Sequence, residues 1–316
     1  MKKSAAAEAA VKERFWPRLK RSLKNDYQLY LLALPAVIYV LVFLYFPMYG
    51  LQIAFKDFTP SKGFAGSAWI GLDHFKRFFN SYQFWPTLWN TISLSLYSLV
   101  VGFLPPIILA ILVSQVGHKR FKGFVQTITY APHFISVVVM VGMLKLMLSP
   151  SSGVINTIIG AFGGNKIDFM GDPGLFRHIY VLSDIWQNIG WSSIIYLSAL
   201  AGVSTELYEA AKVDGASRFQ RILHVDIPGI TPTAITMLIL ACGGIMNMSM
   251  QKVLLMQNSL NLETAEVIST YVYKSGIINQ QYGYSAAAGL FQSVVNVVML
   301  VTVNSISRRV SESSLW

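Results

Sequence analysis

The sequence predicts an all-α integral membrane protein with six transmembrane helices. Its 316 residues are 53% hydrophobic and only 13% charged, whereas soluble chains carry roughly 25% charged residues. Six apolar stretches are long enough to cross a bilayer, which takes about 20 helical residues. Basic residues gather on alternate connections between these stretches, and such an excess of Lys and Arg is typical of cytoplasmic loops.

The six expected spans differ in proline and polar content. Pro105 and Pro106 predict a break or kink within the second span, because neither residue can donate a backbone hydrogen bond. Pro132 predicts a break in the first half of the third span, and the fourth span is the most polar. The expected spans are 29–55, 90–115, 124–148, 179–202, 230–256 and 284–306.

The loop charges orient the chain. The segments on the side of the two termini hold 16 Lys and Arg residues, against 7 on the opposite loops. We therefore expect a cytoplasmic basic segment (1–28), an extracytoplasmic loop (56–84) and a cytoplasmic tail (308–316). The N-terminal residues either are disordered or lie on anionic membrane lipid, with Trp16 among the headgroups. No nucleic-acid-binding motif accompanies the net charge of +10.

The sequence carries no pattern typical of a catalytic or metal site. Cys242 is the single cysteine, so neither a disulfide nor a cysteine-based zinc site can form within the chain. The Gly-rich phosphate loop of ATP-binding proteins is absent, and the five histidines are scattered. We therefore expect no enzyme activity, no catalytic residue, and no metal or cofactor bound by this chain.

A polar stretch between the fourth and fifth spans predicts a helical hairpin at the membrane surface. Residues 207–212 are rich in Glu and Ala, which are strong helix formers. Gly215 ends this helix, because glycine adopts a left-handed turn without steric cost. Residues 217–224 predict a short, basic, amphipathic helix, and we expect Pro228 to close it before the fifth span.

This stretch resembles the EAA loop of the permease subunits of binding-protein-dependent ABC importers. The family pattern is Glu-Ala-Ala, three residues, Gly, nine residues, an aliphatic residue, any residue, an aliphatic residue and Pro. The resemblance implies a type I importer (MetI-like) core of five helices within residues 85–307, a coupling loop at 203–229, and one extra N-terminal helix. Seven positions match in register: Glu209, Ala210, Ala211, Gly215, Val225, Ile227 and Pro228.

The resemblance also implies partners and roles. The family's coupling loop docks on a separate ATPase, so Glu209 would face a basic residue there, and Ala210 and Ala211 would permit close approach of the two surfaces. Gly215 would make the turn, and Arg218 would pair with acids or lipid phosphate. The implied assembly, in a bacterial cytoplasmic membrane, has a second homologous permease, two ATPase subunits that bind ATP and Mg, and an extracytoplasmic solute-binding protein.

Polar side chains inside the expected spans are candidates for the solute path, because polar groups facing lipid are costly. Amides, hydroxyls and an indole suit a neutral, hydroxyl-rich solute. The alternative is that these groups hold helices together. Lys145 and Lys252 lie near span ends, where we expect them to snorkel to the interface. The path candidates are Asp184, Gln187, Asn188, Trp191, Asn247, Gln251, Gln292 and Asn296.

Three further stretches resemble the sugar-permease branch of the family, within it the subgroup that imports oligosaccharides or polysaccharide fragments. They are residues 69–75 (WIGLDHF, with His74 where the branch has Asn), 130–133 (YAPH) and 185–188 (IWQN). This resemblance implies a carbohydrate substrate. An importer of amino acids or anions remains an alternative, and so does a secondary transporter, for which Asp184 is the candidate coupling acid.

Overall fold

The computed structural model describes residues 24–310, and these residues are helical apart from their connections. One isolated bridge, between Lys56 and Trp69, is the extent of β pairing in this range. The predicted all-α class is therefore confirmed. The predictions for residues 1–23 and for the last six residues lie outside the described part. The chain divides into two units, the first ending at Ile53 and the second beginning at Ala54.

The first unit is an apolar helix. It comprises α2 (Tyr27–Val40), a π-helical turn (Leu41–Tyr45) and a 3-10 segment (Phe46–Phe55) that runs into the second unit. Together they form one helical run of 29 residues that is long and apolar enough to cross a membrane. This run contains the expected first span.

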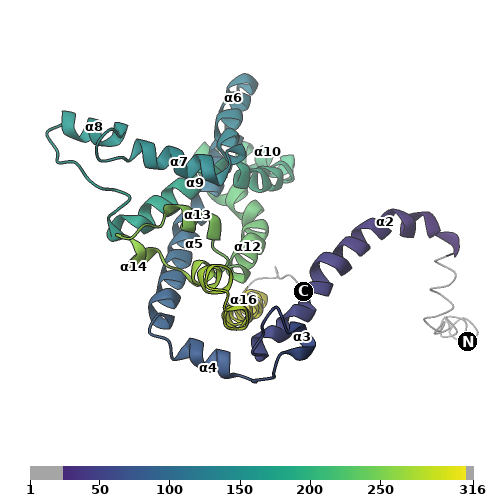
Figure 1. Ribbon diagram of the computed structural model, residues 1–316. Helices are drawn as coiled ribbons and strands as arrows, with labels where there is room; N and C mark the ends of the chain where they lie inside the picture. Colours follow the sequence, from purple (N-terminus) through teal and green to yellow (C-terminus); the bar gives the residue numbers. More distant parts are fainter. Residues whose placement is uncertain (1–23, 311–316) are drawn as a thin grey trace, which may run out of the picture. The chain divides into compact units, whose positions relative to one another are not determined.

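The second unit is built from long helices joined by short ones (Figure 1). The pairs α5–α9 and α12–α16 make its most extensive contacts. Its helices are α3 (Gly63–Gly66), α4 (Asp73–Phe79), α5 (Phe84–Ser114), α6 (Lys119–Tyr130), α7 (Val137–Met147), α8 (Val154–Ala161), α9 (Pro173–Ala201), α10 (Thr205–Val213), α11 (Arg218–Arg221), α12 (Ile227–Gly243), α13 (Met250–Met256), α14 (Leu262–Ala265), α15 (Ile268–Tyr273) and α16 (Tyr282–Val310).

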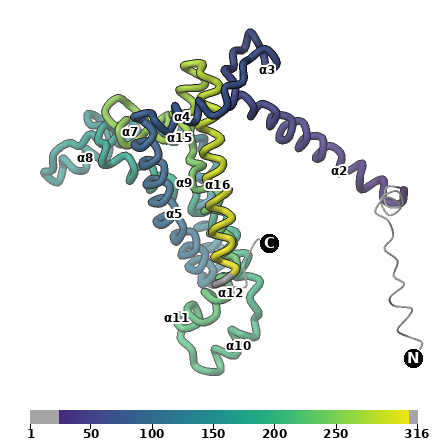
Figure 2. The backbone as a smooth tube through the Cα atoms, turned by 90° about the horizontal axis from the view of Figure 1, so that it is seen from below, coloured from purple at the N-terminus to yellow at the C-terminus, as the bar shows by residue number. Residues whose placement is uncertain are grey.

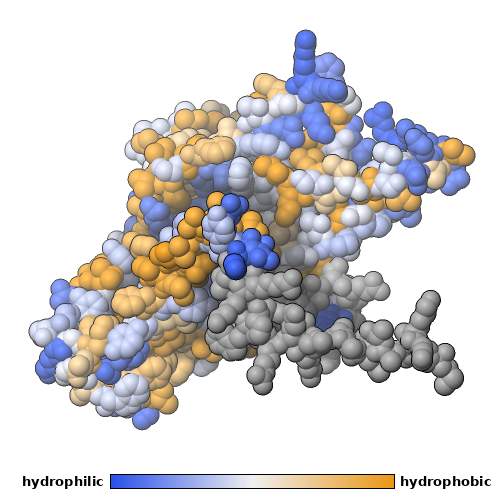
Figure 3. All heavy atoms as spheres, turned by 90° about the vertical axis from the view of Figure 1, so that its right-hand side faces the viewer, coloured by the Kyte–Doolittle hydropathy of each residue, from blue (hydrophilic) through white to orange (hydrophobic). Residues whose placement is uncertain are grey.

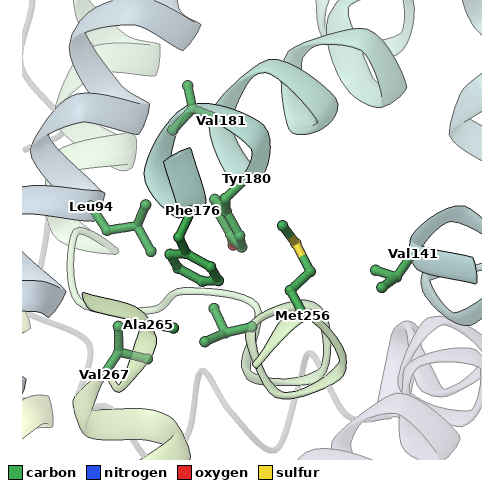
Figure 4. Close-up of a cluster of buried hydrophobic side chains, with 9 residues drawn as sticks. Leu94, Val141, Phe176, Tyr180, Val181, Met256, Ala265 and Val267 are labelled. Atoms are coloured by element: carbon green, nitrogen blue, oxygen red, sulfur yellow. The ribbon is translucent and has the colours of Figure 1, made fainter. Parts of the chain in front are cut away.

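The long helices give the second unit two distinct ends. Figure 2 shows α5, α12 and α16 running together, with the hairpin of α10 and α11 at one end and with α4 and α15 at the other. The largest buried cluster joins α5, α7, α9, α13 and α14 (Figure 4). Leu94, Phe176 and Met256 are buried within it. Figure 3 shows broad apolar areas on the surface, with hydrophilic side chains gathered at projecting tips, as expected where helices face lipid.

Four helical runs in the described part are long and apolar enough to span a membrane. The third expected span is bent: α6 and α7 meet at 100° around the 3-10 turn Ala131–Phe134, and they make a fifth span if the pair crosses as one. Pro132 lies in this turn, so the predicted break is confirmed. α9 is 29 residues long but is not among the apolar runs, because its amides, hydroxyls and Asp184 lower its mean hydropathy.

α5 passes through Pro105 and Pro106 without a break, so the kink, which is the other form of that prediction, stays a prediction. Two predictions about helix boundaries are wrong. Pro228 does not close a helix, because α11, the π segment Ile222–Asp226 and α12 form one continuous run from Arg218 to Gly243. The π turn widens the helix directly before Pro228 and so accommodates its missing amide hydrogen. The fifth span does not continue to Met256, since α12 ends at Gly243 and α13 begins anew.

Candidate functional site

The hairpin is built by local signals at each helix end. The Ser204 side chain caps the start of α10 by accepting a hydrogen bond from the Glu206 amide at 3.2 Å. At the other end Gly215 has a φ of 75°, and the amide of Ala216 donates to the Ala211 carbonyl at 2.8 Å. This pattern is a Schellman motif, which favours glycine at the left-handed position. A capping box between Ser217 and Gln220 then starts α11.

The hairpin presents an exposed surface of mixed character. Glu209 and Ala210 are exposed on α10, as is Arg218 on α11. Two large apolar side chains of the hairpin are exposed as well: Val213 at 88% and Phe219 at 73%. Apolar side chains flanked by charges on a projecting tip are typical of a protein-docking surface.

Behind this surface lies a buried carboxylate that the sequence analysis missed. Asp226 is 1% exposed, and its two oxygens accept hydrogen bonds from the Tyr208 hydroxyl at 2.5 Å and from the Gln115 side-chain amide at 2.8 Å. Burial raises the pKa of Tyr208 to about 12, with a further contribution from Asp226 and an opposing one from Arg221. The sequence contained a signal for this role. An acid directly before a membrane-length apolar run costs free energy to bury unless its oxygens accept hydrogen bonds.

A cavity of about 490 Å³ lies among α5, α9, α12 and the connection that follows α12. Of the eight predicted path residues, Asp184, Asn188 and Trp191 line it. The other five do not: Gln187, Asn247, Gln251, Gln292 and Asn296. Ser95 and Ser98 of α5, which the sequence analysis missed, also line it, and neither hydroxyl has a hydrogen-bond partner in the described part of the chain.

Asp184 forms an ion pair at the cavity wall. The ammonium nitrogen of Lys252 lies 3.1 Å from a carboxylate oxygen of Asp184 and 3.1 Å from the Tyr180 carbonyl. It also lies 4.6 Å from the centre of the Tyr180 ring. Lys252 is 1% exposed, so the prediction that it snorkels to the interface is wrong. Folding of the chain between α12 and α13 brings it inward against α9 instead.

Trp191 is held as a flat wall of the cavity. Its indole stacks on the His133 ring, with centroids 4.6 Å apart and planes 4° apart, and Phe134 meets it edge-on. A ring nitrogen of His133 lies 3.0 Å from the Asn188 side-chain oxygen. The bent α6–α7 connection thus positions both Trp191 and Asn188. Stacking of His133 on one indole face leaves the other as the face that can meet a solute.

Four of the five remaining path candidates hold parts of the chain together. Gln187 is buried and donates to the Ile135 carbonyl at 2.8 Å. Asn296 of α16 donates to Asn247 at 2.9 Å, and Gln292 donates to the Met246 carbonyl at 2.7 Å. These amides tie α16 to the chain between α12 and α13. Gln251 is exposed on α13. The predicted span placed it on one continuous helix with Asn247, but Asn247 lies in the break between α12 and α13.

Comparisons with known proteins agree on one family. Residues 102–312 match the family described as "Binding-protein-dependent transport system inner membrane component". Protein LplB of Bacillus subtilis (strain 168) is 42% identical over 93% of this chain and 93% of its own. The polygalacturonan/rhamnogalacturonan transport system permease protein YteP, from the same organism, is 40% identical over 95% and 93%.

Two solved structures share the fold at similar identity. A chain of a bacterial alginate ABC transporter, in complex with an alginate pentasaccharide-bound periplasmic protein, superposes with a TM-score of 0.87 at 40% identity, covering 94% of this chain and all of that one. A chain of a bacterial ABC transporter involved in the import of the acidic polysaccharide alginate gives 0.85 at 42%, covering 92% and 99%. The chain described here belongs to the family of binding-protein-dependent transport system inner membrane components.

Proposed function

We propose that this chain is the permease subunit of an ATP-binding-cassette importer of oligosaccharides or polysaccharide fragments. Family membership gives the class of transporter and removes the secondary-transporter alternative. The names of YteP and of the alginate transporters support a saccharide substrate. The observation that carries the proposal is the indole of Trp191, which lines the cavity and is held flat by His133.

The chemistry of the cavity wall suits a hydroxyl-rich chain. An indole face stacks on the apolar face of a sugar ring, and the half-buried Asn188 side chain can exchange hydrogen bonds with hydroxyls. Pro106 has no amide hydrogen to donate to the Gly102 carbonyl, and both residues line the cavity. Lys252 is held by Asp184 and does not line the cavity, so the described residues of the wall include no Lys or Arg.

The proposed topology has six spans, with α9 and the bent α6–α7 pair among them, and both termini in the cytoplasm. It assigns residues 85–307 to the transmembrane core, with the hairpin inside the cell. The proposed partners are a second homologous permease that completes the path, an extracytoplasmic solute-binding protein, and two ATPase subunits that bind ATP and Mg. This chain then needs no cofactor of its own.

In this proposal the hairpin transmits the motion of the ATPase. Glu209 and Arg218 contribute charges to the docking surface, and the exposed Val213 and Phe219 contribute apolar area. Ala210 and Ala211 allow the two backbones to approach closely, while Gly215 keeps the turn tight. Pro228 is the second residue of α12 and lies in the continuous helical run that carries the motion into the membrane.

A charge reversal tests the docking role. In the assembled importer we expect Glu209→Lys to abolish stimulation of the ATPase by the loaded binding protein while membrane insertion persists. Glu206→Lys is the matched control, because Glu206 is exposed one turn earlier on the same helix but lies outside the family pattern. Unaltered transport by Glu209→Lys would remove the assignment of the hairpin to coupling.

Affinity purification of the chain from its native membrane tests the assembly. We expect a second permease, an ATPase and a solute-binding protein to come with it, and the binding protein then allows a screen of saccharides. Recovery of the chain as a homo-oligomer without an ATPase would contradict the proposed assembly.

A further inference from the structure

One buried carboxylate joins three helices at the hairpin end of the second unit. Asp226 closes the π segment from which α12 begins. Through Tyr208 it is bonded to α10, and through Gln115, the residue after the last one of α5, it is bonded to that helix. One path from the hairpin to α5 therefore runs through two hydrogen bonds in series, beside the apolar packing of Ile111 of α5 on Ile230 of α12.

Burial of the Asp226 carboxylate costs more free energy than an apolar contact between the same helices would. An ionised carboxylate at 1% exposure loses its hydration, and both of its bonded partners are neutral donors. A leucine would fill similar space without that cost. Hydrogen bonds, however, fix direction as well as distance, whereas apolar side chains can slide past one another. A carboxylate with two bonded partners therefore holds the helices at a set angle.

We propose that Asp226 is a positioning residue that makes α10, α12 and the end of α5 move as one piece. This inference rests on the proposed coupling role of the hairpin. The proposed docking surface lies on the hairpin, and α10 is flanked by two turns, the second of them at Gly215. The bond from Tyr208 to Asp226 transfers the movement of α10 to α12. The bond from Gln115 transfers it to α5, which carries Ser95 and Ser98 at the cavity.

Three substitutions test the two hydrogen bonds and the carboxylate one at a time. Tyr208→Phe removes the bond to α10, and Gln115→Leu removes the bond to α5. Asp226→Asn is the conservative variant: its side-chain oxygen still accepts from Tyr208, and its amide donates to Gln115 once that side chain turns over. Each of these replacements conserves the size of the side chain, so that packing changes little.

The experiment measures whether the hairpin moves with α5. Spin labels are placed on Leu112 of α5 and Leu207 of α10, which are 59% and 54% exposed and lie outside the proposed docking surface, in the complete importer with Cys242→Ala. Distance distributions are compared between the nucleotide-free state and the state trapped with ATP and vanadate. The ATPase that co-purifies with each variant is quantified on the same samples, which reports on docking independently.

We expect one narrow distance in both states for the unmodified hairpin and for Asp226→Asn. Some hairpins in Tyr208→Phe and in Gln115→Leu no longer keep the narrow distance to α5 in the trapped state. The ratio of hairpins that keep this distance to hairpins that lose it falls roughly tenfold, as expected for the loss of one hydrogen bond to a charged group. The double variant falls no further, because either break interrupts a path in series. ATPase recovery stays unchanged throughout.

Three results would overturn the inference. A narrow, unchanged distance in Tyr208→Phe would show that the hairpin is held without Asp226. Additive effects in the double variant would show two independent contacts rather than one path. Loss of the ATPase from Tyr208→Phe would make Tyr208 part of the docking surface. Failure of the docking role itself is distinguishable, because the ATPase would then be missing from the unmodified complex or indifferent to Glu209→Lys.

Discussion

Lys252 and Asp184 form an ion pair whose two members differ sharply in exposure. Their charged atoms are 3.1 Å apart, yet the Lys252 side chain is 2% exposed and that of Asp184 is 45% exposed. Asp184 can be hydrated from the cavity when it is alone. Lys252 cannot, because it lies between α9 and α13 with the Tyr180 carbonyl and ring as its other contacts.

This asymmetry predicts unequal effects of removing either partner. Asp184→Ala leaves a buried ammonium group without its counter-ion and should destabilise the protein by about 3 kcal/mol. Lys252→Met leaves a carboxylate that water can reach, and it should cost about 1 kcal/mol. Unfolding of the detergent-solubilised protein, followed by tryptophan fluorescence, ranks the variants. The double variant should recover most of the loss.

An exposed ion pair provides the control for this comparison. Lys76 and Asp73 are 3.3 Å apart, and their side chains are 72% and 64% exposed. Asp73→Ala should therefore change stability by less than about 1 kcal/mol. If Asp184→Ala were as mild as Asp73→Ala, Lys252 would have access to water that the structure does not show.

The indole of Trp191 predicts a defect in transport rather than in folding. Trp191→Ala removes the stacking face from the cavity and should raise the KM for saccharide uptake roughly fivefold, because a stacked aromatic pair is worth about 1 kcal/mol beyond its buried area. Trp191→Phe should keep part of the effect. Trp186→Ala is the control, since Trp186 lies on the same helix and is 50% exposed but does not line the cavity. Equal KM values for the two alanine variants would exclude Trp191 from the path.

Patterns with local physical causes could be predicted from the sequence. Gly215 takes the left-handed conformation that its place after a helix requires, and Pro132 interrupts the third span. The class of the fold followed from composition and from the length of the apolar runs. These features depend on neighbouring residues alone, so that spacing and side-chain type are sufficient to predict them.

Features that depend on distant contacts could not be predicted. The role of Lys252 is determined by Asp184, 68 positions earlier, and the role of Asn188 is shared with His133 on another helix. The π turn before Pro228 is a backbone adjustment with no side-chain signature. Four of the predicted path candidates belong to α9, yet only neighbouring helices decide that Gln187 is buried while Asp184, Asn188 and Trp191 line the cavity.

Substitution of Gly190 tests how closely α6 packs on α9. A Cβ at Gly190 would lie 2.1 Å from the Thr129 carbonyl oxygen, so that α6 must shift to admit alanine. We expect Gly190→Ala to destabilise the protein by about 2 kcal/mol, as overpacking does, and to weaken transport by moving His133 away from Trp191. Gly142→Ala is the control, because its Cβ would meet nothing within 4 Å and alanine favours the helix. Similar stability of the two variants would contradict the close approach of α6 and α9.

The break between α12 and α13 predicts a structural role for Asn296. Its side-chain oxygen accepts from the Met246 amide at 3.0 Å, and its nitrogen donates to Asn247 at 2.9 Å. Met246 is 2% exposed, so Asn296→Ala leaves a buried amide hydrogen without a partner and should cost about 2 kcal/mol. Gln251→Ala, at an exposed position on α13, should change stability by less than about 0.5 kcal/mol. Hydrogen exchange at residues 244–249 measures the effect, and we expect faster exchange in Asn296→Ala alone. Equal exchange in both variants would show that the break is held by the ion pair of Lys252 rather than by the amides of α16.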